Sequence, residues 1–88
     1  FYTAPAVVAS LYSALARLGV PPDARVLEPG CGSGHFLAAG PPGMRFVGVE
    51  LDGLSARVAR ARCPGHDVRA EDFRDTRLPD GSVDAVVG

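Results

Sequence analysis

Apolar side chains recur at helical spacing in three segments of the chain. Over residues 6–18 they follow the 3.6-residue period, with Pro5 suited to a first turn and Gly19 to a stop. A short helix is expected at about 35–39. A third helix is expected to begin at Asp52 as its cap and to end before Pro64-Gly65. Its predicted apolar face consists of Leu54, Val58 and Ala61.

Four short runs between and after these helices predict strands. They span residues 25–28, 45–50, 68–70 and 83–87. Strands that alternate with helices form a mostly parallel sheet that is covered on both faces and joined by right-handed crossovers. The expected fold class is therefore α/β, a Rossmann-like half of a nucleotide-binding fold.

Composition limits what this chain can bind by itself. The 88 residues suffice for one small domain, and the first residue is Phe1 and not Met, so we expect a truncated part of a longer protein. The formal net charge is −1, so contacts with a nucleic acid are expected to come from parts outside this chain. No apolar run approaches the roughly 20 residues of a membrane span, and no membrane contact is expected.

The two cysteines carry little functional signal. Cys31 and Cys63 lack the spacing of a metal site, so no metal is expected. We interpret them as reduced thiols, which favours a cytoplasmic location.

A glycine-rich loop is the strongest functional signal. Gly30, Gly32 and Gly34 follow the first predicted strand and precede a helix. Such a loop leaves backbone N–H groups facing a crevice, and glycines leave room for a ligand there. The pattern also fits a plain tight turn, so the residues around it decide between the two interpretations.

Two neighbours of the loop favour one ligand class. Glu28 would repel the pyrophosphate of a dinucleotide but attract the ammonium and sulfonium of S-adenosylmethionine. His35 stands where the dinucleotide fingerprint needs Gly or Ala. The expected cofactor is S-adenosylmethionine.

Acidic residues follow the next two strands. Glu50 ends the second strand, where an acid can accept hydrogen bonds from ribose hydroxyls, and Leu51 could lie against adenine. Asp72 can accept from an adenine amino group, and Phe73 can stack on the ring. Glu71 is the competing acid. Solvated surface acids beside a core Phe are the simpler alternative.

Three sequence blocks resemble one family. The segment VLEPGCGSGHFL (residues 26–37) looks like motif I of class I methyltransferases, and more narrowly like the "LEP-(G/A)-C-G-x-G-x-F-L" of N6-adenine DNA methyltransferases. FVGVELD (residues 46–52) is similar to their motif II. FYTAP (residues 1–5) resembles the "F-Y-T-P-P" that precedes motif I in the gamma order, with Ala4 as a departure.

This resemblance implies roles for individual residues. It implies that Thr3 and Glu28 hold the methionine part together with the glycine loop. It implies that Glu50 holds the ribose and that Asp72 and Phe73 hold the adenine. The complete predicted cofactor site consists of Thr3, Glu28, Pro29, Gly30, Cys31, Gly32, Gly34, Glu50, Leu51, Asp72 and Phe73.

The resemblance also implies an activity. The family's catalytic motif, (N/D/S)-P-P-(Y/F/W), follows a strand that ends like residues 86–88, so it is expected just after residue 88, and no residue of the chain is assigned a catalytic role. The expected reaction is methylation of adenine N6 in DNA, on an extruded base. Methylation of protein glutamine or RNA, a non-catalytic cofactor-binding remnant and an oxidoreductase's nucleotide domain are the alternatives. A helicase or a restriction subunit is expected to be fused to the protein or associated with it.

Overall fold

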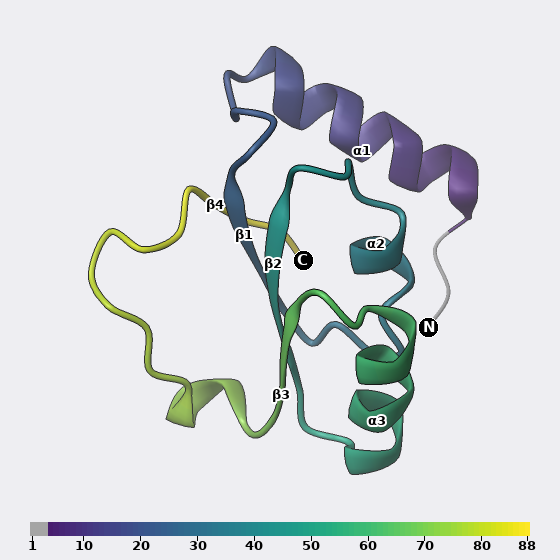
Figure 1. Cartoon of the computed structure of the whole chain (residues 1–88), viewed down its shortest axis with the longest axis vertical. Helices are drawn as coiled ribbons and strands as arrows, with labels where there is room; N and C mark the ends of the chain where they lie inside the picture. The colour runs from purple at the N-terminus through teal and green to yellow at the C-terminus, as the bar shows by residue number, and fades with distance from the viewer. Residues whose placement is uncertain (1–3) are drawn as a thin grey trace.

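The computed structural model describes residues 4–88 and confirms the predicted alternation of helices and strands (Figure 1). All predicted helices and strands are present, with ends that differ from the predicted ones by at most two residues. Of the described helices, none is both long and apolar enough to cross a bilayer. The elements in chain order are α1 (Pro5–Arg17), β1 (Arg25–Pro29), α2 (His35–Ala38), β2 (Arg45–Glu50), α3 (Gly53–Arg62), β3 (Asp67–Ala70), the 3-10 helix η1 (Phe73–Asp75) and β4 (Ala85–Val86).

The four strands form one parallel sheet in the order β3-β2-β1-β4. β1 and β2 are central, and their register pairs Pro29 with Val49, so the loops that follow these two strands leave the sheet side by side. This shared edge is where a Rossmann-like sheet binds its ligands.

The last strand is shorter than predicted. It covers Ala85 and Val86, not residues 83–87. Asp84 accounts for the difference, because its carboxylate accepts the hydrogen bond of the Arg25 N–H at 2.9 Å, where a strand would offer a backbone carbonyl. The side chain thus replaces one backbone acceptor, while the Asp84 and Val87 N–H groups still donate to the carbonyls of Arg25 and Leu27.

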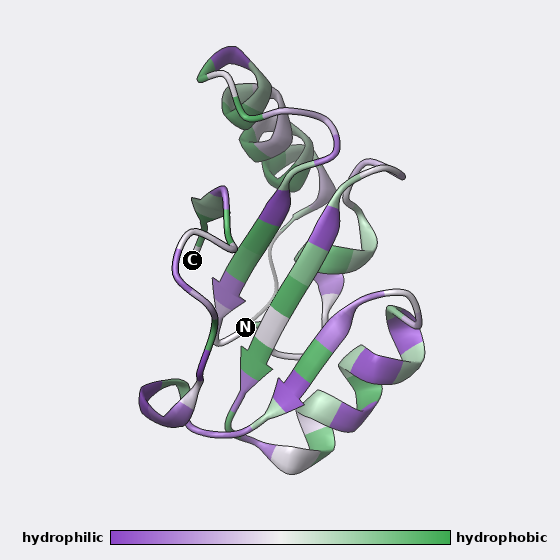
Figure 2. Cartoon of the chain, turned by 60° about the vertical axis from the view of Figure 1, so that its left-hand side comes forward, coloured by the Kyte–Doolittle hydropathy of each residue, from purple (hydrophilic) through white to green (hydrophobic). Residues whose placement is uncertain are grey.

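The sheet has a helix face and a loop face. On the helix face, strand residues such as Val26 and Phe46 pack with buried residues of all three α-helices. On the loop face, Leu27, Val47 and Val49 are covered by residues of the irregular segment 71–84. Figure 1 shows this segment on the opposite side of the sheet from α2 and α3, and Figure 2 shows the apolar middle of β1 and β2 between polar ends. Both faces are covered as predicted, but α-helices cover only one of them.

The predicted apolar face of α3 is wrong. Leu54 and Val58 are exposed, at 68% and 39% of their surface, whereas Ala56 and Ala59 are fully buried. The reason is close packing: a Cβ built on Gly34 would lie 3.1 Å from Ala59, so only small residues fit where α3 meets the glycine loop. Hydrophobicity alone predicted that the larger residues would face the core, but the narrow space beside the loop admits only the alanines.

The apolar stripe of α1 is only partly buried. Val8 is buried, while Leu11 and Leu18 are exposed at 46% and 81%. Tyr12 connects the helix to the core, because its ring stacks on Phe36 at a centroid distance of 4.5 Å. The Tyr12 hydroxyl also donates to the Phe36 carbonyl, and desolvation raises the pKa of this phenol above its ordinary value.

Candidate functional site

The glycine loop lies at the carboxyl end of β1, between Pro29 and α2. Gly30, Gly32 and Gly34 have φ angles of 69°, 58° and 87°, in the left-handed region that side chains avoid. A Cβ on Gly32 would enter open space, whereas one on Gly34 would press against α3. Gly32 therefore leaves room on the open side of the loop, and Gly34 allows the loop to rest on the helix.

Glu50 connects the loops that follow β1 and β2. Its Oε1 accepts a hydrogen bond from the Gly32 N–H and its Oε2 accepts one from the Asp52 N–H, both at 2.8 Å. The Cys31 N–H donates to the Val49 carbonyl at 2.9 Å. Glu50, the residue predicted to bind the ribose, is thus held in place by backbone N–H groups. The remaining lone pairs of its carboxylate can accept further hydrogen bonds. This contact could have been anticipated only from the register of β1 on β2.

Glu28 is the unsatisfied polar group of this region. It is partly buried, and its Oε1 has no hydrogen-bond partner among the described residues. Desolvation raises the pKa of this carboxyl from 4.5 to about 7. A buried carboxyl oxygen without a partner costs free energy, and a cationic ligand would relieve that cost.

Two adjoining hollows bring most of the predicted residues together. A cleft of about 540 Å³ is lined by Glu28, residues 29–33 and Glu50, among others, but not by Gly34, which faces α3. A recess of about 210 Å³ shares Gly30 and Glu50 with this cleft. The other residues that line the recess are Val49, Leu51, Glu71, Asp72 and Phe73. The cleft also includes Ser33, His35, Phe36, Ser55 and Gly88, which the sequence patterns did not select as ligands.

Comparison with known proteins identifies the family and the fold of the chain. The family model described as a methyltransferase domain matches residues 27–88. The chain belongs to the methyltransferase domain family. Its cofactor is S-adenosylmethionine: one curated relative and one solved structure at 27% identity are S-adenosylmethionine-dependent methyltransferases.

Two curated relatives and one solved structure place the chain within the methyltransferases. It is 39% identical to the type II methyltransferase M.XamI of Xanthomonas campestris pv. amaranthicola, over 89% of this chain and 16% of that protein. It is 38% identical to a probable S-adenosylmethionine-dependent methyltransferase of Mycolicibacterium smegmatis, over 70% of this chain and 24% of that protein. The chain therefore spans about a quarter or less of these relatives.

The solved structure is a methyltransferase from Thiobacillus denitrificans in complex with S-adenosylhomocysteine. It is 27% identical, with a TM-score of 0.72, and the match covers 97% of this chain and 37% of that one. The Rossmann-like methyltransferase fold is thereby confirmed.

The cleft residues of this methyltransferase domain fit its cofactor. The unpartnered oxygen of Glu28 can accept a hydrogen bond from an ammonium, and its charge complements a sulfonium. The absence of a Cβ at Gly30 and Gly32 leaves space beside that carboxyl. The expectation of a cation at Glu28 and not a phosphate agrees with both observations.

Cys31 contributes to the methyltransferase cleft through its backbone. Its side chain lies over Gly48 of β2, where a Cβ would approach the sulfur to 2.9 Å. The buried thiol donates to the Gly32 carbonyl, and desolvation raises the thiol pKa to about 11. A thiol with this pKa remains protonated at neutral pH, so Cys31 supports the loop and does not act as a nucleophile.

In the recess, the two acids predicted to bind adenine differ in their present partners. The Asp72 carboxylate pairs with Arg74 at 2.7 Å and caps η1 through the Arg74 N–H. Phe73 and Leu51 are exposed at 47% and 72%. Glu71 lines the same recess, so the choice between Asp72 and Glu71 remains a prediction.

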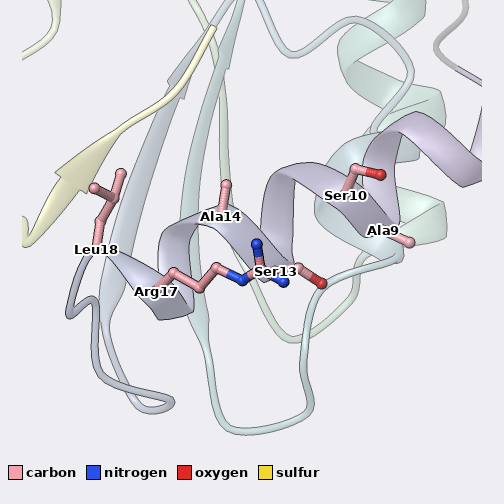
Figure 3. Close-up of a pocket in the computed structure, with 6 residues that line it drawn as sticks. All are labelled: Ala9, Ser10, Ser13, Ala14, Arg17 and Leu18. Carbon is pink, nitrogen blue, oxygen red and sulfur yellow. The ribbon is translucent and has the colours of Figure 1, made fainter.

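One predicted residue and one further hollow lie outside the site described above. Thr3 lies outside the described residues. A hollow of about 600 Å³ runs along α1, where small side chains, Arg17 and Leu18 line it without any residue of the glycine loop (Figure 3). Residues 4–88 contain no cluster of three or more side chains that could hold a metal ion.

Proposed function

We propose that the cleft and its adjoining recess together hold one molecule of S-adenosylmethionine. The methionine part lies against Glu28 and the glycine loop, the ribose lies at Glu50, and the adenine lies in the recess with Asp72 and Phe73. Gly30 and Glu50 line both hollows, which supports one continuous ligand.

The unpartnered oxygen of Glu28 is the observation on which this placement depends. Burial makes a carboxylate costly unless a cation or a donor meets it. When bound, S-adenosylmethionine supplies a methyl group on a positively charged sulfur. Glu28 binds and orients the cationic end of the molecule, and Glu50 holds the loop so that the cleft stays open.

At the adenine end, binding would need a local rearrangement. The Asp72 carboxylate, now paired with Arg74, would turn one oxygen toward the adenine amino group. An exposed ion pair is worth about 0–1 kcal/mol, so this exchange has a small cost. The exposed ring of Phe73 would gain a stacking partner.

We propose adenine N6 of DNA as the methyl acceptor. The residues LEPGCGSGHFL resemble the N6-adenine DNA methyltransferases, and the Xanthomonas relative is a type II methyltransferase. The chain has a net charge of −1, so contacts with a phosphate backbone come from the rest of the protein. A helicase or restriction subunit as partner and a cytoplasmic location remain predictions.

Calorimetry on the full-length protein tests the cofactor. S-adenosylhomocysteine should bind, and NAD should bind far more weakly. Gly32→Val should abolish binding, because the side chain would enter the cleft and because β-branched residues tolerate positive φ poorly. Gly81→Val is the matched control: Gly81 has a φ of 69° and open space around it, but it lies in the turn before β4. If both variants bind S-adenosylhomocysteine equally well, the cofactor does not lie against Gly32.

A tritiated-methyl assay tests the acceptor. The full-length protein should label adenine N6 in duplex DNA and leave RNA and protein unlabelled. Labelling of RNA or of protein glutamine without DNA would reject the acceptor and retain the cofactor site. A protein that binds S-adenosylhomocysteine but labels none of the three would match a cofactor-binding remnant.

A further inference from the structure

The last turn of α3 contacts the glycine loop through two side chains. The Arg62 Nε–H donates to the Ser33 carbonyl at 3.1 Å. The thiol of the neighbouring residue, Cys63, donates to the Gly34 carbonyl at 3.5 Å. Two consecutive residues of one helix end thus meet two consecutive carbonyl groups of the loop.

Packing brings these groups together. A Cβ on Gly34 would lie 3.1 Å from the Ala59 Cα, the Ala59 Cβ and the Cys63 sulfur, so the loop backbone rests directly on α3. Ala59 and Cys63 are buried, whereas Arg62 reaches the loop along the surface. The contact therefore has a buried half and an exposed half.

The contact fixes the orientation of two peptide planes. In a trans peptide the C=O and the following N–H point in opposite directions. With the Ser33 carbonyl turned toward Arg62, the Gly34 N–H points the other way and donates to the Cys31 carbonyl at 3.1 Å. The Gly34 carbonyl is held by Cys63 and by the Ala38 N–H at 2.9 Å, which orients the His35 N–H away from α3.

We propose that Arg62 and Cys63 are positioning residues that hold the glycine loop in its cofactor-binding shape. They act through the backbone of Ser33 and Gly34 and do not touch the cofactor. The inference rests on the proposed function, since it matters only if this loop lines the cofactor site.

The same helix supplies a matched control. Arg60 also uses its Nε–H to donate to a backbone carbonyl, at 3.0 Å, but this carbonyl belongs to Val68 of β3. Arg60→Ala and Arg62→Ala therefore remove the same side chain and the same kind of hydrogen bond, and only Arg62→Ala releases the loop.

The test is calorimetric titration of the full-length variants with S-adenosylhomocysteine, alongside thermal unfolding. Arg62→Ala should weaken binding about fivefold, the value of one hydrogen bond of about 1 kcal/mol, with little change in the unfolding midpoint. Arg60→Ala should bind like the wild type. Equal affinity in Arg62→Ala and the wild type, or equal weakening in both arginine variants, would overturn the role of Arg62.

Rescue by a conservative change tests Cys63. Cys63→Ala removes the donor and should weaken binding about fivefold to tenfold, while Cys63→Ser keeps a donor and should recover most of the affinity. If Ser and Ala weaken binding equally at equal stability, the thiol hydrogen bond does not position the loop.

The Gly32→Val variant separates this inference from the proposed function. Loss of binding in Gly32→Val with wild-type affinity in Arg62→Ala and Cys63→Ala would reject the positioning role alone. Retained binding in Gly32→Val would reject both proposals, because the loop would then not line the cofactor site.

Discussion

The two faces of the sheet are built differently, and each contributes to one of the two hollows: Glu28 lines the cleft and Val49 lines the recess. On the helix face, Phe46 packs edge-on against two other aromatic rings, at centroid distances of 6.1 and 6.3 Å. Strand alternation places Glu28 and Glu50 toward this face. On the loop face, a short irregular segment covers Leu27, Val47 and Val49. Val49 also lines the recess proposed for adenine.

The surroundings of the cleft are expected to be more rigid than those of the recess. The cleft proposed for the methionine part rests on packed helices and on a loop that is hydrogen-bonded to β2 and to the end of α3. The adenine half stands on residues such as Leu51 and Phe73, which are exposed. Regions with few buried contacts open most easily, so ordering on ligand binding is expected mainly at the adenine half.

The largest effect is expected from removing the central aromatic ring of the helix face. Phe46→Ala should lower the free energy of unfolding by about 4 kcal/mol, because Phe46 is 2% exposed and the cavity cannot collapse. Leu78→Ala on the loop face should cost about 1 kcal/mol, since Leu78 is only partly buried. Urea unfolding measures both losses. Equal losses would contradict the difference between the faces.

A smaller but better matched comparison uses two valines. Val26 faces the helices and Val47 faces the irregular segment, and both are 0% exposed on neighbouring central strands. Val26→Ala should cost about 2.5 kcal/mol and Val47→Ala about 1.5 kcal/mol, because the segment can settle into the space that is left. Urea midpoints of the two variants decide this, and the reverse order would show that the loop face is the tighter one.

Replacing one carboxylate by an amide of the same shape, first at Glu50 and then at Asp72, compares their contributions to ligand binding. Glu50→Gln should weaken S-adenosylhomocysteine binding about twentyfold, since its new NH₂ group would oppose the N–H of Gly32 or Asp52. Asp72→Asn should weaken binding about threefold, because Asp72 is already shared with an exposed arginine. Calorimetry provides both ratios. A larger loss in Asp72→Asn would locate the main polar contact in the adenine half.

A further effect on ligand binding is a pH dependence that we assign to Glu28, in the cleft proposed for the methionine part. Bound cation favours the Glu28 carboxylate, whose pKa is raised by desolvation to about 7 in the free chain. Affinity for S-adenosylhomocysteine should therefore increase about tenfold from pH 6 to pH 8, and Glu28→Gln should remove this increase. Titrations at both pH values test it, and an unchanged slope in Glu28→Gln would assign the dependence to another group.

The raised pKa of Glu28 also determines how the stability of the fold depends on pH. Because the folded-state pKa of Glu28 lies above 4.5, the folded chain binds more protons than the unfolded chain between pH 4.5 and about 7. The stabilisation from this group is full below pH 4.5 and is lost as the pH rises through 7.

Local signals in the sequence determined the elements and the centre of the site. Pro5 and Gly19 bracket α1, and the Asp52 side chain caps α3 by accepting from the Ser55 N–H, as predicted. The glycine loop follows β1, and the acids Glu28 and Glu50 line one cleft. The helix ends and the glycine loop depend on residues within a few positions of one another, which is why the local pattern was sufficient for them. Glu28 and Glu50 were each predicted from their place at the end of a strand.

Only the tertiary structure decided which residues meet across the sheet. It buried Ala59 and not Leu54, because the loop approaches α3 too closely for a larger side chain. The register of β2 on β1 lets the Glu50 carboxylate accept a hydrogen bond from the Gly32 N–H, eighteen residues away. The tertiary structure also brought Arg62 to the Ser33 carbonyl and left the Glu28 Oε1 without a hydrogen-bond partner among residues 4–88. Such contacts depend on strand order and on the space between packed elements, and the local pattern of apolar and polar residues predicts neither.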